Sequence, residues 1–280
     1  MSYNAKNMNR QERDGVAFLT FPSFEKYSFV NHAFSTRTGG VSEGIYASMN
    51  LNFGRGDSDE NVVRNFQRFC SAAGFDYSTL VASAQDHHTV VRRVGPEHRG
   101  TGIWKPRDRN SVDGLITKEK NVTLTTFYAD CVPLFFLDPE RRAIGLAHAG
   151  WRGTVAKMGA EMVKAMVREF GSSPKELLAA VGPSIGPCCF EVDAPVYREF
   201  AALTEIRPHE FIVEKGGGKY IIDLWEANRR ILMEAGVPSQ NIEVAQLCTK
   251  CSAQWLWSHR ASGGKRGGLA AMMCLKGEKA

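Results

Sequence analysis

The sequence predicts an α/β (α+β) protein: a single domain in which mixed sheets are flanked by helices. Runs rich in β-branched and aromatic residues alternate with segments in which apolar residues recur every three or four positions. The 280 residues contain no repeat, low-complexity tract or obvious linker. We therefore expect one domain over residues 1–280, with residues 1–15 flexible because they are largely polar.

The first helix is expected after Asp57. This carboxylate can cap the free amides of a first helical turn, and Glu60 would complete a capping box. Apolar residues from Val62 to Phe69 then fall on one face, and Gly74 ends the pattern. The segment is predicted to be a helix packed on the surface of the domain.

Three buried strands are predicted in the middle of the chain. Residues 122–129 (VTLTTFYA) and 132–138 (VPLFFLD) are rich in strand-forming residues, and a turn separates them from 143–148 (AIGLAH). Cys131 and His148 therefore lie at strand ends.

Helices are expected to alternate with further strands. A glycine-bearing turn at 150–154 opens a helix whose apolar residues run from Val155 to Phe170, and Gly171 ends it. A short helix after residue 173 is predicted to lead into a strand at 178–182 (LAAVG).

The last predicted helix is capped by Asp223 and runs to about Glu234. Two glycine-rich pieces, at 216–219 and 262–268, are short enough to be hairpin loops.

Composition and charge exclude several classes of protein. The N-terminus lacks the apolar stretch of a secretory signal and no eighteen apolar residues run together, so we expect a soluble, cytoplasmic protein without a membrane span. The net charge is +5, but the 35 basic residues are scattered, which argues against nucleic acid and suits an anionic small substrate. The seven cysteines are expected to be reduced thiols, and the oligomeric state stays open.

Cys131 and His148 are candidate ligands of zinc or a related ion, which prefers thiolate and imidazole donors and takes three protein ligands in many catalytic sites. Because they end two candidate neighbouring strands, a hairpin would bring them together. The run Gln85-Asp86-His87-His88 offers a third ligand. In an extended segment its two histidines point to opposite sides, so only one faces the metal, and composition does not choose between them.

Two glycine-bearing loops carry an arginine. The turn from Gly150 to Thr154 opens a helix, where free amides favour an anion, and Arg152 can add a bidentate contact. Phosphate could thus bind beside the metal. The loop Ser35–Gly40 presents Arg37 in a similar way.

Four other cysteines carry weaker signals. Cys248 and Cys251 have the CxxC spacing of redox and zinc sites, but a single pair without a second one is poor evidence for metal binding. The adjacent Cys188 and Cys189 would form a strained ring if oxidised, and the expected compartment is reducing. We therefore expect a local structural role for them.

Several separated motifs together resemble the multicopper polyphenol oxidase-like (laccase-domain) family, whose members include purine nucleoside phosphorylases and a peptidoglycan editing factor. They span residues 34 to 260 and include FSTRTGGVS (34–42), ADCVP (129–133), HAGWRG (148–153) and GPSIGPCCFEV (182–192). The resemblance implies a compact fold with two facing sheets.

The same resemblance implies a zinc or copper ion held by the His of a Gln-x-His motif, the Cys of Ala-Asp-Cys and the His of His-Ala-Gly-Trp-Arg-Gly. Here these residues are His87, Cys131 and His148. The chain departs from the usual Gln-Val-His-Gly form at Asp86 and His88, and Tyr128 stands where Thr is more common in the family.

The resemblance further implies phosphorolysis of adenosine, inosine and methylthioadenosine, and deamination of adenosine, with purine nucleoside and phosphate as partners. Cys131 and His148 would belong to the catalytic set. Metal-activated water would attack the purine carbon that carries the amino group, and phosphate held by Arg37 and Arg152 would attack the ribose carbon. Asp113 or Asp130 would be the proton carrier; these two carboxylates complete the expected catalytic set.

Three alternatives remain. A blue laccase needs four coppers and many histidines, whereas this chain has seven histidines and no His-x-His pair, so only a single copper with phenol oxidation as a side activity is possible. A cysteine hydrolase would use Cys131 as nucleophile and His148 as base on an amide of a cell-wall precursor. A structural zinc in an interaction protein is less favoured, because three ligands leave the site open.

Overall fold

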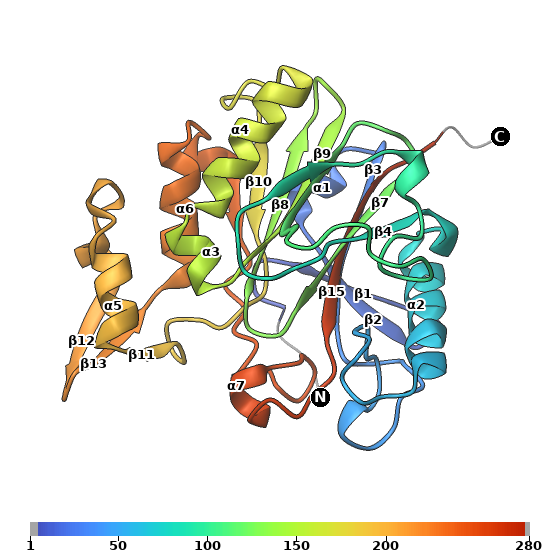
Figure 1. Cartoon of the computed structure of the whole chain (residues 1–280), viewed down its shortest axis with the longest axis horizontal. Helices are drawn as coiled ribbons and strands as arrows, with labels where there is room; N and C mark the ends of the chain where they lie inside the picture. Colours follow the sequence, from blue (N-terminus) through green and yellow to red (C-terminus); the bar gives the residue numbers. More distant parts are fainter. Residues whose placement is uncertain (1–4, 278–280) are drawn as a thin grey trace.

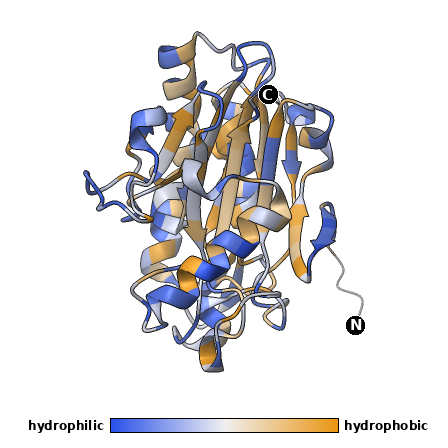
Figure 2. Ribbon diagram, turned by 90° about the vertical axis from the view of Figure 1, so that its right-hand side faces the viewer, coloured by the Kyte–Doolittle hydropathy of each residue, from blue (hydrophilic) through white to orange (hydrophobic). Residues whose placement is uncertain are grey.

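The computed structural model describes residues 5–277. Two six-stranded sheets pack face to face, and a three-stranded sheet lies to one side of them (Figure 1). Apolar residues run along the strands of both large sheets (Figure 2). The predicted α+β class, with mixed sheets flanked by helices, is confirmed, and the two facing sheets match what the family resemblance implies.

The first large sheet contains both parallel and antiparallel pairs. Only β4 and β7 run parallel within it, and the other neighbours are antiparallel. Its strands, in spatial order, are β1 (Asn9–Arg13), β2 (Val16–Thr20), β3 (Val30–Ser35), β15 (Leu269–Leu275), β7 (Thr123–Tyr128) and β4 (Leu80–Ala82).

The second large sheet is packed on both faces, against the first sheet on one side and against helices on the other. In spatial order it contains β14 (Ile242–Val244), β10 (Leu178–Val181), β8 (Val132–Asp138), β9 (Ala143–Ala149), β6 (Gly114–Thr117) and β5 (Val91–Arg93). Side chains from both sheets interleave between them, including Phe34 and Met273 from the first and Phe135 and Leu146 from the second. All four are fully buried.

Helices cover the outer faces. Helix α2 (Asp59–Ala73) packs on the first sheet through Val62, Phe66 and Phe69, while α4 (Met158–Phe170) and α6 (Leu224–Glu234) cover the second. The shorter helices are α1 (Pro22–Glu25), α3 (Trp151–Val155), α5 (Ala194–Ala201), α7 (His259–Ser262) and the 3-10 turns η1 (Gly44–Tyr46), η2 (Tyr77–Thr79), η3 (Pro96–His98), η4 (Thr204–Ile206), η5 (Pro208–Glu210) and η6 (Ser239–Asn241). Between residues 5 and 277, no helix has the length and apolar character needed to cross a membrane.

The N-terminal segment differs from expectation. Of residues 1–15, which we expected to be flexible, residues 1–4 lie outside the described part of the chain, and Asn9–Arg13 form β1. This strand is polar because it lies at the edge of the sheet, where it pairs only with the fully buried β2. The polar residues of Asn9–Arg13 therefore belong to an edge strand and do not indicate a flexible terminus.

Two predicted helix boundaries need correction. Helix α2 begins at Asp59 after Ser58, and Asp57 does not cap it; its carboxylate instead accepts hydrogen bonds from Ser42 and Asn50. At the other end Gly74 adopts the left-handed conformation that closes the helix, as predicted.

The predicted helix from Val155 to Phe170 is interrupted at Lys157, whose φ is +58°, so α3 and α4 are separate. The break lets Met158 and Met162 of α4 pack directly over Gly114, where any side chain would collide with them. The short helix expected after residue 173 is only a turn before β10.

The third sheet contains β11 (Glu191–Asp193), β13 (Lys219–Ile222) and β12 (Ile212–Gly216). Residues 216–219 are the hairpin loop between β12 and β13, as predicted. The second glycine-rich piece, 262–268, is not a hairpin loop, because it leads from α7 into β15. Asp223 caps α6 as expected, by accepting from the backbone amides of Trp225 and Glu226.

Candidate active site

Three side chains form a cluster: two lie at the ends of neighbouring strands of the second sheet, and one lies in the loop between β4 and β5. One donor atom each from His87, Cys131 and His148 lie within 4.8 Å of one another. Strands β8 and β9 pair antiparallel with Pro133 opposite His148, which brings Cys131, at the start of β8, beside the end of β9. The hairpin predicted from the sequence is therefore confirmed.

His87 reaches the cluster from a bent loop after β4, so the opposite-facing geometry of an extended segment does not apply to it. Its backbone has φ of +72°, a conformation uncommon for residues other than glycine. The neighbouring His88 is exposed, and its Nδ1 lies 2.8 Å from the carboxylate of Asp86. Only His87 joins the cluster, which agrees with the choice that the family resemblance makes.

Asp113 contacts both histidines of the cluster or the loop that carries them. Its buried carboxylate accepts hydrogen bonds from the backbone amides of Asp86, His87 and His88 at 3.1, 3.2 and 3.2 Å. It also lies 2.8 Å from Nδ1 of His148. With Nδ1 donating to Asp113, Nε2 is the nitrogen that remains to bind a metal, which is the usual arrangement around metal-binding histidines.

The cluster favours the thiolate form of Cys131. Burial acts to raise the pKa of this thiol, but the adjacent His148 and His87 outweigh it and lower the pKa to about 6. Burial likewise acts to lower the pKa of His148, but Cys131 and Asp113 outweigh it and raise the pKa to about 9. A thiolate is the form of cysteine that binds metal ions, and an ion that binds here must displace the proton that the raised pKa keeps on His148.

The donor set and the free space both fit a metal ion. Two imidazoles and one thiolate leave a fourth position open, as in catalytic zinc sites, and the same donors also suit copper. Gly150 lies against the cluster, where an added Cβ would be 3.0 Å from Cδ2 of His87 and 3.1 Å from Sγ of Cys131. Glycine at this position therefore leaves the ligands free to close around an ion.

The cluster opens on a cavity of about 300 Å³, at the lower end of the range for small-molecule sites. The three residues of the cluster form part of its wall, and arginine and aromatic side chains form much of the rest. The lining residues are Asn52, Phe53, Gly54, Arg55, Gln85, His87, Arg107, Phe127, Tyr128, Ala129, Cys131, His148 and Arg266.

Arg266 is a buried cation that forms no salt bridge among residues 5–277, although Asp130 and Cys131 are close enough to act to raise its pKa. The residue is 8% exposed, its Nη1 donates to the carbonyl of Gly267, and its Nε has no hydrogen-bond partner among residues 5–277. Burial, reinforced by the nearby Arg55, lowers the pKa of Arg266 to about 10. A bound anion would offset the cost of burying this charge.

The arginines expected to hold phosphate lie elsewhere. Arg37 donates from Nε and Nη2 to the carbonyl of Ala47 and from Nη1 to that of Ala253, and it stacks 3.9 Å from the ring of Trp257. Arg152 is exposed and stacks on its own neighbour, with its guanidinium 4.2 Å from the Trp151 ring. Neither lines the cavity. The expectation that they hold phosphate beside the metal is therefore not supported by their positions.

Neither candidate proton carrier lines the cavity. Both oxygens of the Asp113 carboxylate already accept hydrogen bonds, from the amides of the His87 loop and from His148. Asp130 accepts a hydrogen bond from the hydroxyl of Thr249 at 2.6 Å through one oxygen and from the backbone amide of Arg260 at 2.7 Å through the other. Asp113 therefore holds the two histidines of the cluster, and Asp130 holds the turn that precedes Cys131.

Comparison with known proteins shows the family to which the chain belongs. Residues 31–276 match the family model described as multi-copper polyphenol oxidoreductase laccase. The chain belongs to this family. It is 37% identical over 244 residues to purine nucleoside phosphorylase YlmD of Bacillus subtilis, covering 87% of each chain. It is also 37% identical over 250 residues to a purine nucleoside phosphorylase of Bacteroides thetaiotaomicron, covering 89% of this chain and 93% of the relative.

Solved structures of family members share the whole fold. The crystal structure of YlmD from Geobacillus stearothermophilus has a TM-score of 0.88 at 34% identity, covering 97% of this chain and all of that one. Hypothetical protein YfiH of Bacillus licheniformis has a TM-score of 0.89 at 32% identity, covering 95% and 99%. The resemblance inferred from the motifs is thus confirmed.

Sequence reasoning missed the three arginines of the cavity. Arg55 and Arg107 lie in irregular loops, and Arg266 lies in the glycine-rich piece before β15. The one available signal was Arg266, because the glycines on either side of the Lys265-Arg266 pair allow the backbone to bring this charge close to a ligand.

Proposed function

We propose that this protein is a metal-dependent purine nucleoside phosphorylase that acts on adenosine, inosine and methylthioadenosine and also deaminates adenosine. The observation that carries the proposal is a single cavity in which a His–Cys–His metal centre faces three arginines. The two relatives named purine nucleoside phosphorylase support the reaction class.

The wall of the cavity offers separate surfaces for the two substrates. Phe53, Phe127 and Tyr128 provide aromatic surface suited to a flat purine base. Arg266 and Arg55 provide the positive charge suited to a phosphate dianion, which accepts bidentate hydrogen bonds from guanidinium groups. We therefore assign phosphate to the arginine side of the cavity, in place of the earlier expectation of Arg37 and Arg152.

Phosphorolysis would then proceed by displacement at the sugar. An oxygen of hydrogen phosphate held by Arg266 bonds to the anomeric carbon as the bond from that carbon to the purine nitrogen breaks. The base leaves with the electron pair and takes up the proton that the hydrogen phosphate releases. His87, Cys131 and His148 would hold a zinc or copper ion, which supplies Lewis-acid stabilisation of developing negative charge. Asp113 keeps the two histidines oriented during the reaction.

The test is phosphate-dependent release of free base from inosine and adenosine by wild-type protein of known zinc and copper content. His87→Ala and Cys131→Ala are expected to abolish release, because each removes a metal ligand. His88→Ala is the matched control, since this exposed neighbour lies outside the cluster, and it is expected to retain activity. Absence of base release by wild-type protein at every metal loading would refute the phosphorylase assignment.

Two further readouts of the same proteins separate the remaining activities. Conversion of adenosine to inosine without phosphate tests the deaminase activity. Oxidation of phenols by the copper-loaded form, compared with the zinc-loaded form, tests whether a laccase-like side reaction depends on the metal at the same three ligands.

A cysteine hydrolase is the second candidate, favoured by one observation. Cys131 lies beside His148, and Asp113 contacts the other ring nitrogen of that histidine, which is also the arrangement of a Cys–His–Asp triad. Iodoacetamide separates the two readings. If zinc protects Cys131 from alkylation and a chelator removes the protection, the metal centre is supported; alkylation unaffected by metal, together with hydrolysis of cell-wall peptides, would favour the hydrolase.

A further inference from the structure

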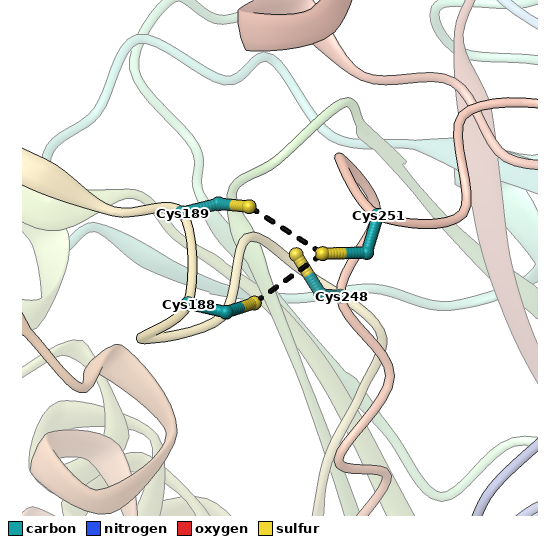
Figure 3. A group of neighbouring side chains, drawn as sticks. All are labelled: Cys188, Cys189, Cys248 and Cys251. Atoms are coloured by element: carbon teal, nitrogen blue, oxygen red, sulfur yellow. Dashed lines mark hydrogen bonds between the residues drawn. The ribbon is translucent and has the colours of Figure 1, made fainter.

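Four cysteines outside the active site meet where two loops come together (Figure 3). Cys188 and Cys189 lie in the loop that follows β10, and Cys248 and Cys251 lie in the loop that follows β14. Because β10 and β14 pair in parallel, both loops leave the same edge of the sheet, and a bridge between Ser184 and Cys248 holds them together.

The four sulfur atoms have the spacing of a metal site. All lie within 4.8 Å of one another, and the Sγ atoms of Cys188 and Cys189 are 3.4 and 3.5 Å from that of Cys251. Tetrahedral zinc bound to thiolates at about 2.3 Å places its sulfurs about 3.8 Å apart, within the observed range. All four cysteines are free thiols.

The local backbone directs the sulfurs toward one point. Turn hydrogen bonds from the amides of Cys189 and Phe190 to the carbonyl of Gly186 curl the chain, so that the side chains of the adjacent Cys188 and Cys189 both face Cys251 (Figure 3). The amide of Gly186 donates to Sγ of Cys248 at 3.3 Å. Backbone amides that donate to sulfur favour a thiolate, which is the ligand form.

The sequence alone does not reveal this arrangement, because neither pair of cysteines is a metal-binding motif by itself. A single CxxC lacked a second pair, and two adjacent cysteines suggested only local structure. The parallel pairing of β10 and β14 places the two pairs of cysteines side by side, although they are about sixty positions apart in the sequence.

We propose that Cys188, Cys189, Cys248 and Cys251 form a second metal site, a closed tetrathiolate that binds Zn²⁺. Four protein ligands leave no position for substrate, so the site is structural. Cys188 and Cys251 are exposed and admit the ion from solvent, while the buried Cys248 anchors the site to the core.

The proposed zinc would hold the surroundings of the active site. Thr249, within the CxxC turn, donates its hydroxyl to Asp130, the residue before Cys131. Arg260 of α7 donates its backbone amide to the same carboxylate, and its guanidinium reaches the carbonyls of Cys189 and Glu191. A metal that fixes the two loops therefore also fixes the turn that carries a ligand of the first centre.

The test is the zinc stoichiometry of full-length protein saturated with Zn²⁺ under reducing conditions and freed of excess ion by gel filtration. Wild-type protein is expected to hold two zinc ions per chain, Cys251→Ser one, His87→Ala one, and the double variant none. Cys251→His keeps a ligand and is expected to hold two. Cys274→Ala, which removes a buried thiol outside both clusters, is the matched control and is expected to hold two.

Cobalt substitution identifies the ligands independently of activity. Co²⁺ in a four-sulfur tetrahedral site gives strong thiolate-to-cobalt absorption, which Cys251→Ser should lose and His87→Ala should retain. One zinc per wild-type chain that is unaffected by Cys251→Ser overturns the proposal. A Cys188–Cys251 disulfide in the zinc-saturated, reduced protein overturns it as well. Both outcomes are distinct from failure of the phosphorylase assay, because neither depends on turnover.

Discussion

Replacing Asp113 by Asn is the most informative single change at the first metal centre. The carboxylate accepts four hydrogen bonds, three from backbone amides of the His87 loop and one from Nδ1 of His148. An amide has one oxygen, and its NH₂ group can only donate. Whichever way the amide turns, two donors face an NH₂ group.

The two orientations have different consequences. If the oxygen stays with Asp86 and His88, the NH₂ group faces Nδ1 of His148 and drives its proton to the nitrogen that binds metal. If the oxygen stays with His148 and His87, the other two loop amides lose their acceptor. Loss of such an outer partner lowers metal affinity by roughly 10- to 100-fold, or about 1.4–2.7 kcal/mol. Each unpaired buried donor costs a further ~1–3 kcal/mol of folding stability.

Competition with a chromophoric chelator measures the affinity, and urea unfolding of the metal-free protein measures the stability. Asp108→Asn is the control, because it removes the same charge from an exposed carboxylate paired with Arg92. We expect that control to bind zinc like the wild type. If Asp113→Asn also binds zinc and unfolds like the wild type, the positioning role assigned to Asp113 is wrong.

Three further changes test other parts of the structure. Gly150→Ala places a Cβ about 3 Å from His87 and Cys131, so zinc affinity should fall about tenfold in the chelator assay, ~1.4 kcal/mol, while the fold persists. Arg266→Gln removes the unpaired buried cation and should raise the KM for phosphate about tenfold or more, with a smaller change in the KM for nucleoside. His32 is buried and its pKa is lowered to about 4, chiefly by burial, so the folded state disfavours the proton that the unfolded chain binds below pH 6.5. Its contribution to stability is complete above pH 6.5 and is lost as the pH falls toward 4, about 3 kcal/mol in total.

Urea unfolding at pH 7.5 and pH 5 checks the last prediction, with about 2 kcal/mol of the loss expected at pH 5. His32→Gln should lose that much less stability over this interval than the wild type, and equal losses would contradict the assignment. For Gly150→Ala, unchanged zinc affinity would show that the ligands do not need the space. For Arg266→Gln, a wild-type KM for phosphate would place the anion elsewhere.

The parts of the fold that local pattern controls could be predicted from the sequence. Strands β8 and β9 and the cap of α6 at Asp223 match the predictions because continuous apolar runs and capping carboxylates act within a few residues. The break at Lys157 could not be predicted, since it depends on how Met158 packs over the second sheet.

The residues of the site also differ in whether the sequence could predict them. Cys131 and His148 could be placed because a hairpin joins them, whereas the choice of His87 needed the family resemblance. The role of Asp113 depends on four donors from two segments, which no local pattern shows. Arg37 looked like a phosphate ligand by its loop, but the fold turns its guanidinium onto backbone carbonyls and an indole ring.

Asp130 connects the two proposed metal sites. Its φ of +82° is unfavourable for a residue with a side chain, at about 1–3 kcal/mol, and such a conformation persists only where surrounding contacts impose it. Here those contacts are the hydroxyl of Thr249, the amide of Arg260 and the amide of Ile185, which donates to the Asp130 carbonyl at 2.9 Å. The first and last come from the two loops that the four cysteines join. Because Cys131 follows directly, loosening those loops lets the turn relax and shifts a ligand of the first centre without removing it. Loss of the second site should therefore weaken zinc binding at the first site but not abolish it.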